Sequence, residues 1–142
     1  NEEIKYFFGK VTMYLEYPKQ ARDLILTFIG HYFPDNDGLV TAKSPLDFYN
    51  DTSFFIKEIS TLNYEEAYKL LTQYVRKLNT SVPPLISAYM SLSSTMKSFG
   101  TALNKKFGDV EETGILISIN DIFEQKKERH INSYLKEKNG DT

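Results

Sequence analysis

A run of aromatic and β-branched residues followed at once by a helical repeat does most to limit how this chain can fold. Residues 4–14, IKYFFGKVTMY, have the composition of a buried β-strand, and Gly9 indicates a bulge or a close approach to the backbone. Tyr17-Pro18 ends this strand. From Lys19 to Phe33 the apolar residues recur at helical spacing: Ala21, Leu24, Ile25, Phe28, Ile29 and Tyr32. A strand that leads into an amphipathic helix predicts a sheet with helices layered on it.

The middle of the chain predicts a turn and then further helices. Residues 34–38, PDNDG, have turn composition, and residues 39–42 are expected to form a short strand. Residues 47–60 are ambiguous, with a short helix as the favoured interpretation. Residues 64–78 repeat with helical spacing behind Asn63, a favourable N-cap residue. Another helix is expected to start at Pro83-Pro84 and to continue to Leu92.

The last third of the chain contains the clearest strand. Residues 114–119, GILISI, form a continuous apolar run that predicts a strand buried on both faces. Asp121 is expected to cap a last charged helix that extends to about Leu135. We find no repeat and no linker, so residues 1–142 are predicted to form a single α+β domain with a mixed sheet and four to five helices.

Charge and composition exclude several classes of function. A net charge of −2 gives no overall attraction to nucleic acid, and the absence of cysteine excludes disulfides and thiolate metal sites. No apolar run has the roughly 20 residues of a membrane span. We therefore expect a cytoplasmic protein. Asn1 is neither an initiator methionine nor the start of a signal peptide, which leads us to expect that an upstream segment has been removed.

The densest polar chemistry lies in residues 107–114, FGDVEETG. Asp109, Glu111 and Glu112 stand at the entrance to the expected strand, where partial burial can raise a carboxyl pKa toward that of a general base. The alternative is a polar loop in which Asp109 or Glu111 only accepts backbone N–H bonds. Loops at strand ends often carry functional residues, which favours a role for the segment as a whole.

Other candidate residues carry weaker signals. Residues 82–92 could line an apolar channel, with Met90 as an adaptable wall, although an ordinary core helix is the commoner case. His31 and His130 are expected at helix ends or on the surface. The basic residues around Arg129 alternate with acids, as on a solvated helix face. No metal-ligand spacing or phosphate-binding loop is present.

Three segments together resemble a known family: the opening YFFGKVTMY with KQARDLILTFIGHYFPD, the long PPLISAYMSLSSTMKSFGTALNKKFGDVEETGILISINDI, and the closing KKERHI. They are similar to bacterial proteins named hemolysins, which are GNAT-like long-chain N-acyltransferases. These enzymes join a fatty acyl group to an amino acid or a similar amine. The resemblance extends from about Ile4 to about Leu135.

The resemblance implies a GNAT-like fold and an acyl carrier protein or acyl-CoA thioester as co-substrate, with no permanently bound cofactor. The family's products are glycine lipids, ornithine lipids or N-acyl amides. Direct attack by the amine needs a base and oxyanion donors but no enzyme nucleophile, which agrees with the lack of cysteine. Family members also carry an upstream half that holds the donor's pyrophosphate. The resemblance therefore implies that this chain is a C-terminal portion, inactive without the N-terminal half.

Pattern and resemblance together lead to one set of expected site residues. Asp109, Glu111 and Glu112 are expected beside the amine as catalytic groups, and the substrate-binding residues are expected to be Tyr89, Met90, Arg129 and His130. The last two are also expected to contact an acidic carrier protein. The alternative is a non-enzymatic interaction domain that pairs with a partner or with a second copy as a homodimer. Peripheral membrane contact is a further option, whereas no element is long enough for pore formation.

Overall fold

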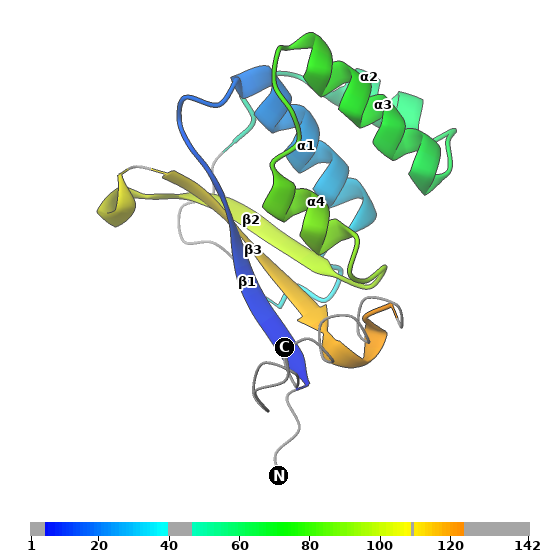
Figure 1. Ribbon diagram of the computed structural model, residues 1–142, viewed down its shortest axis with the longest axis vertical. Coiled ribbons are helices and arrows are strands. Elements are labelled where there is room, and N and C mark those ends of the chain that lie inside the picture. The colour runs from blue at the N-terminus through cyan, green and yellow to red at the C-terminus, as the bar shows by residue number, and fades with distance from the viewer. Residues whose placement is uncertain (1–4, 40–46, 109, 124–142) are drawn as a thin grey trace, which may run out of the picture.

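The computed structural model describes residues 5–39, 47–108 and 110–123, which form a three-stranded sheet with four α-helices on one face (Figure 1). The strands are β1 (Tyr6–Met13), β2 (Lys97–Asn104) and β3 (Val110–Ser118). The helices are α1 (Lys19–Tyr32), α2 (Ser53–Ile59), α3 (Tyr64–Lys77) and α4 (Pro84–Met90), and two 3₁₀-helices flank β3: η1 (Lys105–Phe107) and η2 (Ile119–Asp121). The α+β class expected from the sequence is confirmed.

Strand β3 is the middle strand of the described sheet, whose order is β1-β3-β2. Both neighbours run antiparallel to it, so the mixed sheet expected from the sequence is not found within the described residues. The sequence analysis did not predict strand β2. A β-bulge between Ser98 and Thr101 breaks its alternation of inward and outward residues, and this alternation is the signal by which a strand is recognised.

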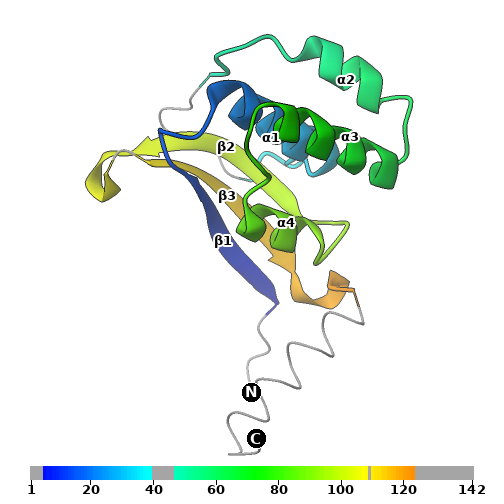
Figure 2. The same cartoon turned by 45° about the horizontal axis from the view of Figure 1, so that its top comes forward.

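The expectation that residues 114–119 are buried on both faces is wrong. The strand begins earlier, at Val110, and only one face is covered: Ile115 and Ile117 are at most 1% exposed, whereas Leu116 and Ser118 are half-buried. The reason is visible in Figure 2, where all four helices lie on the same side of the sheet. The opposite side, here called the outer face, receives none of the described helices.

Helix α1 is the centre of the hydrophobic core. Every residue from Ala21 to Ile29 is buried, because the helix lies between the sheet on one side and helices α2 and α3 on the other. A helix covered on all sides has no solvated stripe. This explains why Arg22 and Asp23, which the helical repeat would place on an outer surface, are inside the molecule.

The other helices begin close to where the sequence places them. The side chain of Asn63 accepts a hydrogen bond of 2.9 Å from the backbone N–H of Glu66, which confirms the N-cap of α3. Pro84 occupies the first turn of α4. The expected strand at 39–42 falls almost entirely outside the described residues, as does most of the expected helix after Asp121; Asp121 itself ends η2. No helix within the described ranges is long and apolar enough to cross a membrane.

Aromatic side chains gather on the outer face and along β1. Phe8 stacks on Phe99 with ring centroids 6.0 Å apart, and both rings lie over Gly114. Tyr6, Phe7 and Phe8 are 61%, 44% and 54% exposed. Among the described residues β1 pairs with β3 on one side only, so its other edge is open. Exposed aromatic groups at an open edge form a surface suited to contact with another protein segment.

Gly9 provides a test of the packing between β1 and α4. A Cβ atom at this position would lie 3.0 Å from Phe7 Cε1 and 3.1 Å from the hydroxyl oxygen of Tyr89. Gly9→Ala should therefore lower the free energy of unfolding by about 1–3 kcal/mol in chemical denaturation. Adding Tyr89→Phe should recover part of that loss, because it removes one of the three atoms that would lie within 3.3 Å of the new Cβ.

Gly30→Ala is the matched control, since a Cβ there meets nothing within 4 Å. This exposed helical position should gain up to about 1 kcal/mol. If Gly9→Ala cost no more than Gly30→Ala, the close approach of Tyr89 to β1 would be wrong.

Candidate functional site

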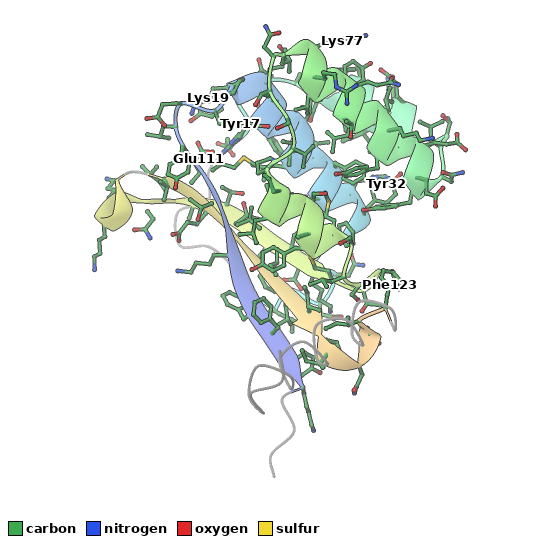
Figure 3. All side chains as sticks on the ribbon, viewed as in Figure 1. Tyr17, Lys19, Tyr32, Lys77, Glu111 and Phe123 are labelled. Atoms are coloured by element: carbon green, nitrogen blue, oxygen red, sulfur yellow. The ribbon has the colours of Figure 1, made fainter. Side chains whose placement is uncertain are left out.

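A buried group of charged side chains joins the start of α1 to the start of β3. Arg22, Asp23 and Glu111 are 1%, 0% and 2% exposed. The Nε atom of Arg22 donates to Glu111 Oε2 at 2.7 Å, and its Nη1 donates to Asp23 Oδ1 at 2.6 Å. We call these three residues the buried ion cluster. Lys19 lies at its border, with Nζ 3.9 Å from Glu111 Oε1, and Figure 3 shows Lys19 and Glu111 at the same end of the sheet.

The chain before α2 closes over the buried ion cluster. Asp23 Oδ2 accepts hydrogen bonds from the backbone N–H groups of Tyr49 and Asn50 at 2.9 and 2.7 Å. Arg22 also donates to the carbonyl of Asp47, and its guanidinium lies 5.0 Å from the ring centroid of Tyr49 and 5.9 Å from that of Phe48. Both rings are more than half exposed. They therefore separate the cluster from solvent.

The charge balance of the cluster favours an ionised guanidinium with spare donor capacity. Burial by itself would lower the pKa of Arg22, but the hydrogen bonds that its guanidinium donates to Asp23 and Glu111, and the charges of these two carboxylates, outweigh it and the pKa is raised overall. The Nη2 atom of Arg22 is buried and has no hydrogen-bond partner among the described residues. An unpaired donor of a buried cation costs free energy unless it binds an acceptor. This atom is therefore suited to a carboxylate or carbonyl oxygen.

The two acids of the Glu111-Glu112 pair point to opposite faces of the sheet. Both belong to β3, and adjacent residues of a strand alternate between faces. Glu111 faces the helices, whereas Glu112 lies on the outer face, where it pairs with Lys10 at 3.4 Å and accepts from Asn104 at 3.0 Å. The two carboxylates therefore cannot both contact one substrate amine. Glu111 keeps one oxygen, Oε1, whose nearest donors are Tyr49 at 3.4 Å and Lys19.

An apolar cavity lies at the other end of α1. It has a volume of about 560 Å³ and opens between α1, α3 and α4; its lining consists of Tyr32, Phe33, Tyr64, Tyr68, Ser87, Met90, Ser91, Ser94 and Phe123. Tyr32 and Phe123, labelled in Figure 3, lie far from Glu111 in that view. Since Arg22 and Tyr32 are ten residues apart on one helix, about 15 Å of helix axis separates the ion cluster from the cavity. We call this space the aromatic cavity.

The structure locates four of the seven residues expected at a site. Met90 lines the aromatic cavity, but the neighbouring Tyr89 points to β1, where its ring packs 6.0 Å from that of Phe7. Glu111 and Glu112 lie on opposite faces of β3. Asp109, Arg129 and His130 lie outside the described residues. No group of three or more potential metal ligands is found in the described parts of the chain.

The sequence analysis missed the partner of Glu111. Arg22 and Asp23 are separated from Glu111 by almost 90 residues, and an Arg-Asp pair in a helix ordinarily indicates a solvated face. Only their position directly before the largely apolar run from Leu24 to Ile29 gave any signal. His31 was correctly placed: it is exposed in the last turn of α1 and packs edge-on against Tyr32.

Comparison with known proteins finds two close relatives. The chain is 51% identical over 134 residues to a glycine N(alpha)-acyltransferase of Phocaeicola vulgatus and 50% identical over 136 residues to one of Bacteroides thetaiotaomicron. These matches cover 94% and 93% of this chain but only 41% and 39% of the relatives. The chain therefore spans about two fifths of the length of the curated relatives it matches. The resemblance to bacterial N-acyltransferases that the sequence indicated is therefore confirmed for the portion of those proteins that the chain matches.

Two other comparisons gave no match. No protein-family model matches the chain, and the comparison with solved structures found no match.

Glu111→Gln tests the buried ion cluster. The amide keeps a hydrogen-bond acceptor for Arg22 but removes one of the two charges that compensate the buried cation. We expect a loss of about 2–4 kcal/mol in the free energy of unfolding. Glu112→Gln, which removes the adjacent acid on the outer face, should cost less than about 1 kcal/mol because its partner Lys10 is 59% exposed and can return to water. Equal losses in urea denaturation would contradict the buried cluster.

Tyr64, in the wall of the aromatic cavity, makes the folding stability of the protein sensitive to high pH. Burial, helped by the neighbouring Tyr68 and Tyr32, raises the pKa of Tyr64 from 10.0 to about 12. Between these values the unfolded chain releases the proton and the folded chain retains it, so folding stability is intact below pH 10 and falls as pH rises toward 12. In alkaline denaturation, Tyr64→Phe should make the free energy of unfolding fall less steeply with pH. Tyr14→Phe, at an exposed position, is the control and should leave the pH dependence of stability as in the parent protein.

Proposed function

We propose that this chain is part of an N-acyltransferase that transfers a long-chain fatty acyl group from a thioester to the amine of glycine. The observation that carries the proposal is the identity of about half the residues, over nearly the whole chain, with two proteins named glycine N(alpha)-acyltransferase. Because those relatives are more than twice as long, the proposed activity belongs to a protein of that length. An acyl carrier protein or acyl-CoA is the proposed donor, and ornithine is the alternative amine.

The proposed reaction needs few groups from the protein. The glycine nitrogen attacks the thioester carbonyl carbon, a C–N bond forms, the C–S bond breaks, and the proton lost by the amine ends on the departing thiolate. The enzyme must accept that proton and stabilise the oxyanion, but it needs no covalent nucleophile. The lack of cysteine in the chain is compatible with this route.

Within the described residues, the buried ion cluster fits these needs best. We assign the proton acceptor to Glu111 through its less engaged oxygen, Oε1. The unpartnered Nη2 of Arg22 would donate to the glycine carboxylate or to the oxyanion. Since both side chains are enclosed, substrate reaches them only when Phe48 and Tyr49 move aside. Asp109, Arg129 and His130 retain the roles expected from the sequence as proposals.

The open edge of β1 agrees with a role inside a larger enzyme. Exposed Tyr6, Phe7 and Phe8 form a surface that a further segment or domain would cover. The same surface favours the second candidate, a non-enzymatic domain that binds a partner or a second copy. The two candidates differ in their chemistry, because only the first yields an N-acylated product.

Lipid analysis of cells that express the gene carrying this chain at its natural length tests the proposal. Mass spectrometry should show long-chain N-acylglycine in these cells and none in cells with the empty vector. Glu111→Gln should lower its yield roughly 100-fold or more per folded molecule, the usual size of a general-base effect. Glu65→Gln, an exposed acid on α3, is the control and should leave the yield unchanged.

Three results would contradict parts of the proposal. A gene that yields no acylated amine overturns the enzymatic function, and acylation of another amine overturns glycine as the acceptor. A large loss in Glu112→Gln with full yield in Glu111→Gln would move the proton acceptor to the outer face of the sheet.

A further inference from the structure

The aromatic cavity is lined without a single charged side chain among the residues that the structure describes. Its walls consist of five aromatic rings, one methionine and three serines. The ring centroid of Tyr64 lies 5.1 Å from that of Tyr32 and 6.4 Å from that of Tyr68, and Phe33 lies edge-on to Tyr64. A site for a phosphate or carboxylate would need cationic or N–H donors. The cavity is therefore suited to an uncharged, apolar part of a ligand.

Several hydroxyl groups of the wall are already satisfied within the protein. Tyr68 and Ser87 share a hydrogen bond of 2.9 Å that links α3 to α4, and the Ser91 hydroxyl donates to the carbonyl of Ala88 at 2.8 Å. These groups do not need a polar ligand to pair with. The surface that these residues present to the cavity is therefore aromatic ring and aliphatic carbon, which favours the binding of a hydrocarbon chain.

Size and position fit an extended chain. A methylene group fills roughly the space of a water molecule, about 30 Å³, so a volume of about 560 Å³ corresponds to roughly 19 methylene groups. The ion cluster lies about 15 Å away along α1. Both sites lie on the side of the sheet that the helices cover.

We propose that the aromatic cavity binds the hydrocarbon chain of the long-chain acyl group, with Met90 and Tyr68 as its inner walls. The inference rests on the proposed function for the origin of that chain, but it is a statement about binding and is tested without catalysis. It assigns Ser91 and Ser94, both exposed, to the cavity rim. A bulky side chain at the rim should therefore exclude the ligand while leaving the core intact.

The test uses the chain of residues 1–142 and parinaric acid, a fluorescent fatty acid whose emission rises in apolar surroundings. Saturable binding is expected, and saturated fatty acids of 8, 12 and 16 carbons should displace the probe with rising affinity. Each methylene group that becomes buried should tighten binding about fourfold until the cavity is full.

Two serine variants form a matched pair. Ser91→Trp places a large ring at the rim of the cavity and should weaken probe binding at least tenfold. Ser60→Trp is the control, because Ser60 is also exposed and also donates to a helix carbonyl, that of Ile56, but lies outside the cavity. Since the chain contains no tryptophan, the indole emission of each variant also reports whether lipid binds next to the new ring.

Ser94→Trp provides a second rim variant if Ser91→Trp does not fold, as judged by circular dichroism. The proposal is overturned if parinaric acid does not bind saturably, or if a folded rim variant binds it as well as Ser60→Trp does. Either result, together with N-acylglycine production in cells, would overturn the lipid-binding role of the cavity and leave the proposed function intact. Normal lipid binding without any acylated product would overturn the proposed function and leave the lipid-binding role intact.

Discussion

The ion pair between Arg22 and Glu111 is the contact on which the rest of the arrangement depends. It joins the first turn of α1 to the start of the middle strand, and through Asp23 it also fixes the segment before α2. A buried cation costs several kcal/mol to remove from water and is tolerated only where carboxylates and backbone groups surround it. The three elements are therefore held in one geometry by a requirement of charge balance, in addition to hydrophobic packing.

The sheet with helices on one face only divides the molecule into two surfaces of different character. On the inner side, α1 is buried between the strands and α2 and α3, and the ion cluster and the aromatic cavity lie toward its two ends. On the outer side, the exposed ring of Phe8 stacks on the buried ring of Phe99, and the far edge of β1 has no partner strand among the described residues. The inner side therefore offers a buried charged group and an apolar cavity. The outer side offers exposed aromatic surface for contact with a further segment.

The proposed acyl transfer draws on two features together, the buried ion cluster and the aromatic cavity about 15 Å away along α1. Glycine and the acyl group enter the proposal from the two similar acyltransferases, and among the described residues the geometry offers a carboxylate oxygen, a buried N–H donor without a partner and an uncharged cavity. Neither end alone would distinguish this activity from simple lipid binding or from a structural ion pair.

Local pattern was enough to determine the elements with strong periodicity. The helical spacing of 19–33, the N-cap at Asn63 and the proline at the start of α4 are properties of short segments, because backbone hydrogen bonds and caps form between near neighbours. Strand β2 could not be found, since its bulge is defined by its pairing with β3. The opposite orientations of Glu111 and Glu112 and the burial of Arg22 were decided only in three dimensions. Whether the charge of Arg22 is paired or solvated depends on Glu111, almost 90 positions away in the chain. No local pattern in the sequence shows that these two residues meet, because only the tertiary fold brings them together.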